Sequence, residues 1–267
     1  MAINDRPVVN STFYDENGNA AIVDPNGFQY SASPGVAIAR GLISGGVISM
    51  QGGYVSTSAT SIVAVRATTY TEQSANFTAT VSSSSANDAA AGTGTRTVKI
   101  TYYDQTMSGP FTETLTMNGT SNVTATHSNY CFIERIDSIT VGSNGTNVGT
   151  ISIKNGATTV GTIAASDGQT FWAHHYVQAG KTCFIKRLLL GTQGASCGGI
   201  LRVALPLTAN ALERQFGGQF RIITAQPQQV YDLEDLPIAG PARITMYVKP
   251  DATTANTVQV SLIFYEL

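Results

Sequence analysis

Histidine is the first side chain of this sequence to consider for chemistry. His174 and His175 are adjacent, so on a strand their rings point to opposite faces and cannot both serve one site. His127 stands alone in the sequence. The histidines therefore indicate no general acid or base, and we expect no catalytic residue among them.

Cysteine offers no metal site by its spacing. A zinc site needs Cys or His ligands at short spacing, and the sequence has no CxxC pair. A free cysteine packs as a small hydrophobic residue. We therefore expect buried, reduced thiols and no bound metal. The cysteines are Cys131, Cys183 and Cys197.

Carboxylates cluster in the run DLEDL, which contains Asp232, Glu234 and Asp235. Three carboxylates can bind Ca²⁺ if a loop gathers them, but a solvated corner is the commoner use. The remaining acids are scattered singly, so no pair is indicated for glycoside hydrolysis, and no G-x-S-x-G elbow occurs. GTGTRT lacks the GK[ST] ending of a phosphate loop. We expect no enzyme and no cofactor.

The composition narrows the classes of partner. Of 267 residues, 42% are hydrophobic, which is enough for a packed core, and only 12% are charged. A net charge of −2 without a Lys/Arg cluster argues against nucleic-acid binding. The apolar stretches are too short to span a membrane, and the start, MAINDRPVVN, lacks the apolar run of a signal peptide. We expect no nucleic acid, no membrane, and synthesis in a cytoplasm.

The elements that carry these side chains read as strands. Residues 97–104 put Val98, Ile100 and Tyr102 on one face, and residues 243–248 and 257–264 alternate in the same way. Turn sequences with Asn-Gly or Asp-Gly recur between such runs, as in sandwiches and barrels. The sequence predicts an all-β fold, an antiparallel, jelly-roll-like β-sandwich present once or twice after an N-terminal arm. One short helix is expected at residues 208–216.

Three regions are expected along the chain. Residues 1–75 form an arm or small β unit, residues 76–190 a β-sandwich domain, and residues 191–267 a C-terminal β region that packs with that sandwich or stands alone. The N-x-S/T sequences mark surface positions at Asn10, Asn76, Asn118, Asn122 and Asn144. The middle core should contain Val98, Ile100, Tyr102, Phe132, Ile136, Ile151 and Ile153.

The run SSSSANDAAAGTGT, residues 82–95, precedes the strongest strand and is called the tether below. Its small residues bury little, while ordering costs roughly 1–2 kcal/mol per residue. We therefore expect the tether and residues 1–35 to be ordered mainly by other copies or by a partner protein. For its two nearby charges, Asp88 and Arg96, a local contact is expected.

The tether and the segments after it resemble virion structural proteins of tailed bacteriophages. The matching pieces are the lead-in and strand to residue 104, the hairpin at residues 113–120, the strand at residues 132–136 and GSNGTNVGTI at residues 142–151. HHYVQAGKTCFIKRLLL is similar to a further strand of that family, with Gln178 where proline is usual. The resemblance covers about residues 36–190 and includes no catalytic signature.

The resemblance implies a structural component of a phage virion. The expected role is a capsid-decorating (cement) or fibre-like protein, a homotrimer that contacts major capsid or tail proteins. A surface of low charge suits such packing, and neighbouring copies can cover strand edges. The alternative is a tail-associated or host-surface protein that binds glycan through Trp172, Tyr176 and Tyr130. A capsule depolymerase is the third class, and the missing acid pair argues against it.

Overall fold

Antiparallel strands make up the named elements of the computed structural model. The structure describes residues 22–23, 29–30, 38, 46–58, 61–193, 196–204, 213–215, 220–222, 229–251 and 256–267. The prediction of an all-β, antiparallel chain is confirmed. Within these ranges no helix has the length and apolar character needed to cross a membrane.

The chain divides into two compact units, residues 1–48 and residues 49–267. In the first unit β1 (Ile22–Val23) pairs antiparallel with β2 (Gln29–Tyr30). The rest of the predicted arm at residues 1–35 lies outside the described residues. The second unit contains two hydrophobic cores, which are called the first core and the second core.

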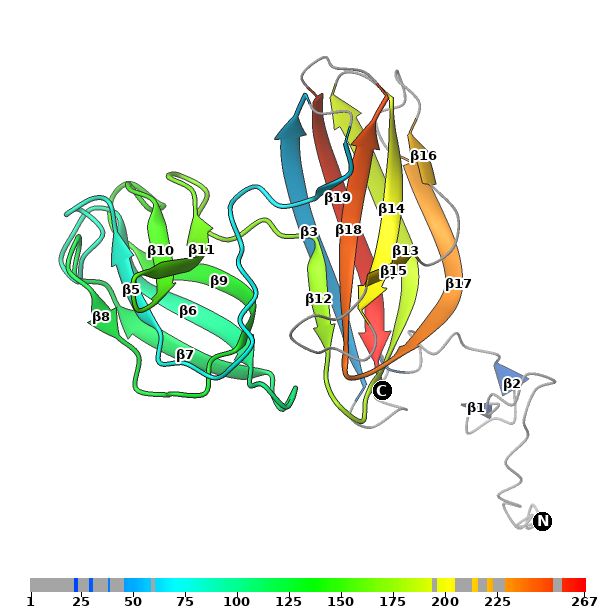
Figure 1. Ribbon diagram of the computed structural model, residues 1–267, viewed down its shortest axis with the longest axis horizontal. Helices are drawn as coiled ribbons and strands as arrows, with labels where there is room; N and C mark the ends of the chain where they lie inside the picture. Colours follow the sequence, from blue (N-terminus) through cyan, green and yellow to red (C-terminus); the bar gives the residue numbers. More distant parts are fainter. Residues whose placement is uncertain are drawn as a thin grey trace, which may run out of the picture. The chain divides into compact units, whose positions relative to one another are not determined.

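The first core lies between two sheets of orders β11-β10-β5-β8 and β7-β6-β9 (Figure 1). Gly156-Ala157 forms the tip of the β10–β11 hairpin, and Gly156 has a φ of 58°, which glycine adopts without a steric penalty. The strands are β5 (Thr80–Ser83), β6 (Thr95–Tyr103), β7 (Phe111–Thr116), β8 (Val123–Thr124), β9 (Phe132–Val141), β10 (Ile151–Asn155) and β11 (Thr158–Ile163).

Six of the seven residues predicted for this core are in it: Val98, Ile100, Tyr102, Ile136, Ile151 and Ile153. The prediction for Phe132 is wrong, because Ile133 points into the first core instead. The register of β6 against β9 shifts between Thr101 and Tyr102, and such a bulge changes which residue faces inward. Phe132 packs in a small separate cluster with Tyr103 and Tyr176.

The second core lies between sheets of orders β17-β13-β19-β3 and β12-β18-β14-β15, with β16 on β14 and β4 on β18 (Figure 1). The strands are β3 (Val47–Thr57), β4 (Val63–Ala64), β12 (His174–Val177), β13 (Thr182–Gln193), β14 (Cys197–Ala204), β15 (Glu213–Gln215), β16 (Phe220–Ile222), β17 (Gln229–Ala239), β18 (Ala242–Pro250) and β19 (Asn256–Glu266).

In the second core, strands that come early in the sequence pair with strands that come late. The early strand β3 pairs with the last, β19; β12 pairs with β18, β13 with β17, and β14 with β15. The predicted alternation of β19 agrees with this arrangement, because its inward residues are buried while Gln259 is exposed. The inward residues are Val258, Val260, Leu262 and Phe264.

The chain that builds the first core is inserted between β4 and β12. Arg66 and Trp172 form an antiparallel bridge; Ala67 N donates to Phe171 O (3.0 Å) and Ala173 N to Val65 O (2.9 Å). Residues 67–171 therefore leave and return at one place, and are called the inserted module. The pairing of β13 with β17 and β19 runs across the boundary predicted at residue 190, and β3 and β4 from the predicted N-terminal region join the same sheets.

Smaller predictions have mixed outcomes. Of the expected helix at residues 208–216, the structure describes residues 213–215, and these form strand β15, so this part of the prediction is wrong. Asn10 lies outside the described residues. The other four N-x-S/T asparagines are exposed, as predicted: Asn76, Asn118, Asn122 and Asn144.

Candidate functional site

The tether is held within its own module by one buried carboxylate. Asp88 is fully buried and accepts hydrogen bonds from Ser83 Oγ (2.6 Å), Thr95 N (2.8 Å), Val148 N (2.9 Å) and Gly149 N (2.9 Å). Burial raises the pKa of Asp88, but these hydrogen bonds outweigh it, so the pKa lies below its usual value. These five residues are called the Asp88 cluster.

The pieces that carry the phage resemblance meet at this cluster. Gly119 of the NGT hairpin donates its N–H to Asp88 O, and Asn147 of the GTN turn donates to Gly149 O and Ala164 O. The expectation that outside contacts order the tether is therefore wrong for residues 82–95. The reason is polar: a buried carboxylate that binds one hydroxyl and three N–H groups stabilises a segment whose side chains bury little apolar area.

No contact joins Asp88 to Arg96 in the part of the chain that the structure describes. Arg96 Nε instead donates to Gly92 O at 3.1 Å. The expected local pair is wrong for a physical reason, since the carboxylate is already occupied by one hydroxyl and three backbone N–H groups. Asp88 of the tether and Arg96 next to it therefore act separately, and each forms hydrogen bonds with backbone groups.

Glu113 fixes a second loop of the inserted module in the same way. It accepts hydrogen bonds from Thr126 N (2.7 Å), Thr126 Oγ1 (2.8 Å) and Tyr130 Oη (2.8 Å). Burial raises the pKa of Glu113, but the hydrogen bonds outweigh this effect and hold the pKa below its usual value. His127, at 3.1 Å from Glu113, is a half-exposed neighbour of this carboxylate.

Strand β12 sends its two adjacent histidines to different partners, as the sequence predicts. His175 lies between two carboxylates, with Nδ1 at 2.8 Å from Glu134 Oε1 and Nε2 at 2.9 Å from Glu266 Oε1. Burial lowers the pKa of His175, but the two carboxylates outweigh this effect and raise it to about 9. The ring is therefore a buried imidazolium that links β9, β12 and β19.

A group of mixed metal-ligating side chains surrounds this ring. Ligand atoms of His175, Cys183 and Glu266 lie within 4.8 Å of one another. Both ring nitrogens already contact carboxylates, and burial raises the pKa of the Cys183 thiol well above its usual value. A protonated His175 ring that donates one N–H to each carboxylate accounts for this geometry without a further ligand.

His174 faces the other side and is neutral. Burial and the nearby Arg66 charge hold the pKa of His174 well below its usual value, and Nε2 donates to Ile133 O at 3.1 Å. The Tyr70 and Tyr176 hydroxyl groups lie beside it, 2.6 Å apart. This side of β12 is therefore a closed aromatic and polar contact with the inserted module.

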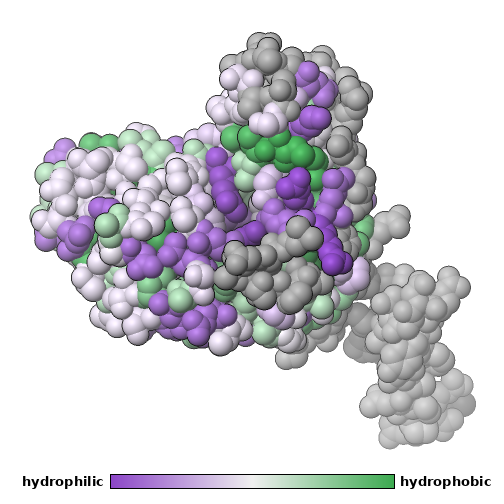
Figure 2. Space-filling model, in the orientation of Figure 1, coloured by the Kyte–Doolittle hydropathy of each residue, from purple (hydrophilic) through white to green (hydrophobic). Residues whose placement is uncertain are grey.

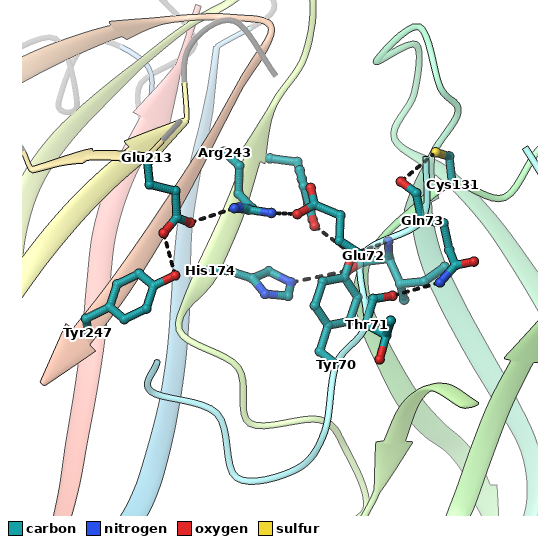
Figure 3. A network of polar contacts seen from close by, with 11 residues as sticks. Tyr70, Thr71, Glu72, Gln73, Cys131, His174, Glu213, Arg243 and Tyr247 are labelled. Carbon is teal, nitrogen blue, oxygen red and sulfur yellow. Dashed lines mark hydrogen bonds and ion pairs between the residues drawn. The ribbon is translucent and has the colours of Figure 1, made fainter. Parts of the chain in front are cut away.

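Figure 3 shows the charged network next to His174. Arg243 on β18 pairs with Glu72 of the inserted module and with Glu213 of β15 (2.6 Å). Tyr247 Oη donates to the second oxygen of Glu213 at 2.5 Å. Burial lowers the pKa of Arg243, with a contribution from Arg66. The network joins the second core to the inserted module.

The remaining candidates are also structural. All three cysteines are free and buried, as predicted, and burial raises the pKa of both Cys131 and Cys197 to about 11. Asp232 lies within strand β17 and accepts a hydrogen bond from Arg187 (2.6 Å), so the expected corner is wrong, although the Asp232 side chain is exposed to solvent as expected. The side chains of Glu234 and Asp235 lie outside the described residues.

The three aromatic residues considered for glycan binding are buried: Trp172, Tyr176 and Tyr130. Two aromatic rings that the sequence did not single out, Tyr54 on β3 and Phe171, are half-buried and lie 5.4 Å apart. They line an open pocket of about 450 Å³ with Arg135 of β9 and residues of β19. No sequence pattern indicated this pocket, since its walls come from four distant segments.

Comparisons with known proteins add little. No protein-family model matches the chain, and no curated protein sequence matches it. A chain in a structure of infectious bursal disease virus, Gx strain, is 11% identical, with a TM-score of 0.23, over 83% of this chain and 77% of that chain. One of the Gt strain is 9% identical, with a TM-score of 0.24, over 83% and 71%. TM-scores this low carry no argument about fold or function.

Proposed function

We propose that the chain is a structural component of a virion that acts through protein–protein contacts. The observation that carries this proposal is the strand order of the second core. We infer an eight-stranded jelly roll from the order of sheets β17-β13-β19-β3 and β12-β18-β14-β15, in which early strands pair with late ones. Jelly rolls recur in viral capsid proteins, although a fold alone does not fix a function.

Two further features support the proposal. The motifs that resemble tailed-phage virion proteins meet at the Asp88 cluster, where they hold backbone and leave no reactive group exposed. In Figure 2 the surface over strands β5–β8 is mostly pale, with small purple and green areas, which fits a surface of Ser, Thr and Gly. Few charges must lose water when such a surface meets another protein.

The finer role that we propose is a capsid-decorating or fibre-like protein of a tailed phage, present as a homotrimer and without catalytic activity. The long edge strands β3 and β17 carry exposed apolar residues, including Met50 (60% exposed) and Val230 (53%). Edge strands of this length invite pairing with another chain unless they are covered. Contacts with neighbouring copies or with a capsid protein are the covering that we propose.

The test is to locate the protein on purified particles. Particles made with a mutant lacking this gene are complemented in the host with wild-type, Asp88→Ala or Asp104→Ala protein, then examined by mass spectrometry and cryo-electron microscopy. We expect the wild-type and Asp104→Ala proteins to give density on the particle, and the Asp88→Ala protein, which loses the Asp88 cluster, to be missing. Absence of the wild-type protein from purified particles would contradict the proposal.

A separate measurement tests the lack of catalysis. The pure protein is incubated with host-surface polysaccharide, and released reducing ends are counted. We expect no release above the buffer control. Release that a single carboxylate substitution abolishes would show that the protein is an enzyme.

A further inference from the structure

We propose that the pocket beside β3 binds a neutral saccharide. The pocket, of about 450 Å³, lies between residues 50–54 of β3, residues 259–261 of β19, residues 169–171 and Arg135. Its volume is within the range of sites for small organic ligands and suits one or two sugar rings. The inference is independent of the virion role, because it rests on the lining of the pocket alone.

The walls of the pocket are held in place by the surrounding backbone. Gln169 bridges to Asp137 of β9, and Thr170 N donates to Ile136 O at 2.9 Å. A methyl group at Gly53 would lie 2.5 Å from Ala173 N, so only glycine lets β3 lie this close to the segment that carries Phe171. A pocket with fixed walls loses little conformational entropy when a ligand binds.

One wall is aromatic. The Tyr54 and Phe171 rings are tilted by 47° to one another, and the Tyr54 hydroxyl donates to Asp167 (3.3 Å). Aromatic rings that are only half covered offer apolar area to a ligand that also has polar groups. A pyranose is such a ligand, because the C–H groups of one ring face can pack on an aromatic ring while its hydroxyl groups stay free for hydrogen bonds.

Apart from Met50, Val260 and Arg135, the remaining side chains of the lining are uncharged and polar. Gln51, Gln169, Gln259 and Ser261 provide amide and hydroxyl groups, which both donate and accept hydrogen bonds, as sugar hydroxyl groups require. Two of the amides are pre-oriented: Gln51 Nε2 donates to Glu134 (2.7 Å), and Gln169 Oε1 accepts from Arg135 (2.9 Å). A purely apolar ligand would leave these groups without partners, at a cost in affinity.

The charges favour a neutral ligand over an anion. Arg135 is the cation of the pocket lining, and its Nε already donates to Asp137 Oδ1 at 2.5 Å. Because that carboxylate balances the guanidinium, a phosphate or acidic sugar would meet little net positive charge. The remaining exposed face of Arg135 can still donate to a hydroxyl group.

The experiment is saturation-transfer NMR on the full chain, followed by titration calorimetry of any sugar that binds. The probes are glucose, galactose, mannose, N-acetylglucosamine, maltose, cellobiose, lactose and chitobiose, with inorganic phosphate and N-acetylneuraminic acid as anions. We expect at least one neutral sugar to bind in the millimolar range and both anions to give no signal. Phe171→Ala and Gln259→Ala should each weaken binding by about tenfold or more.

Gln193→Ala is the matched control, because Gln193 is an exposed glutamine of the same sheet outside the pocket. It should bind as the wild type does. Gln259 is exposed on β19, so its substitution should leave the melting temperature unchanged and keep the test valid if Phe171→Ala misfolds. The absence of saturation transfer from every sugar, binding of the anions alone, or equal binding by Gln259→Ala and the wild type would each overturn the proposal.

Discussion

The two cores of residues 49–267 use buried charge in different ways. In the inserted module Asp88 and Glu113 accept hydrogen bonds mainly from backbone N–H and hydroxyl groups and so fix loops of the same module. In the second core His175 and Arg243 pair with Glu134 and Glu72, which belong to the inserted module. The buried carboxylates of the inserted module therefore stabilise loops of that module, whereas the buried cations of the second core also pair with carboxylates of the inserted module.

This difference predicts which substitutions should destabilise the inserted module alone and which should weaken its contact with the second core. Loss of an internal carboxylate should destabilise the inserted module, because the N–H groups that it binds have no other acceptor. Loss of a charge between the modules should instead weaken their association. Each measurement below tests one side of this contrast.

The largest effect is expected for Asp88→Ala. The substitution leaves the N–H groups of Thr95, Val148 and Gly149 buried without an acceptor. At about 1–3 kcal/mol for each of the three donors, the loss in unfolding free energy should be roughly 3–9 kcal/mol. Urea unfolding followed by fluorescence measures it.

Asp104→Ala is the matched control for that prediction. Asp104 also accepts hydrogen bonds from two backbone N–H groups, those of Thr106 (2.8 Å) and Ser108 (2.9 Å), but in an exposed loop where water can replace it. Its loss should cost about 1 kcal/mol or less. Equal costs for the two variants would mean that the Asp88 cluster is not the internal closure described above.

The next effect compares the two apolar cores directly. Ile100 and Leu262 are both fully buried, one in each core. Either substitution by alanine should cost roughly 2–5 kcal/mol. Because the cores are separate clusters, Ile100→Ala should lower the melting of the inserted module and Leu262→Ala that of the second core, seen as different transitions in calorimetry. One shared transition that shifts equally in both variants would contradict two separable cores.

A smaller effect should appear as a pH dependence from His175. Glu134 of β9, Glu266 of β19 and Cys183 of β13 face its ring, and the pKa of about 9 in the fold is above the ordinary 6.5. The folded state therefore holds the proton more tightly. The resulting stability is fully present below pH 6.5 and is lost as pH rises through 9, by up to on the order of 3 kcal/mol.

The comparison variant is His175→Gln, which cannot take up this proton. Its unfolding free energy should be lower than that of the wild type at pH 6 and should approach it near pH 9.5. Parallel pH curves for the two proteins would show that His175 is not held as an imidazolium.

The smallest effect is expected at the surface of the second core. Arg187 and Asp232 pair at 2.6 Å, but their side chains are 48% and 61% exposed. Exposed pairs contribute little, so Arg187→Ala should change the unfolding free energy by less than about 1 kcal/mol. A loss as large as that from Leu262→Ala would contradict the expectation that exposed ion pairs stabilise this protein less than buried residues do.

Local pattern predicted the strands but not their partners. The alternation of Val98, Ile100 and Tyr102 needs only neighbours in sequence, and it placed the inner face of β6 correctly. The pairing of β3 with β19 depends on residues about two hundred positions apart, which no local period reports. Phe132 was misplaced because a bulge shifts the register, and a bulge leaves no mark in the alternation of one strand.

The site shows the same limit. Asp88 had one usable signal, a single acid in a run of small uncharged residues, which is typical of a carboxylate that caps backbone. Tyr54, Arg135 and Phe171 had none, because the pocket exists only after β3, β9 and β19 come together. Chemistry that one segment carries can be predicted, and chemistry that several segments assemble cannot.

The inserted module leaves the second core at Ala67 and returns at Phe171, where a backbone hydrogen bond ties the two crossing points together. A segment whose ends meet can be exchanged without breaking the strand pairing of its host, although here His175 and Arg243 would lose their partners Glu134 and Glu72. Replacing residues 67–171 with a short turn should keep the strand order of the second core, and another domain with adjacent termini can stand in the same position. An exchange of this kind would let one part of the chain stay constant while the other part diversifies through evolution.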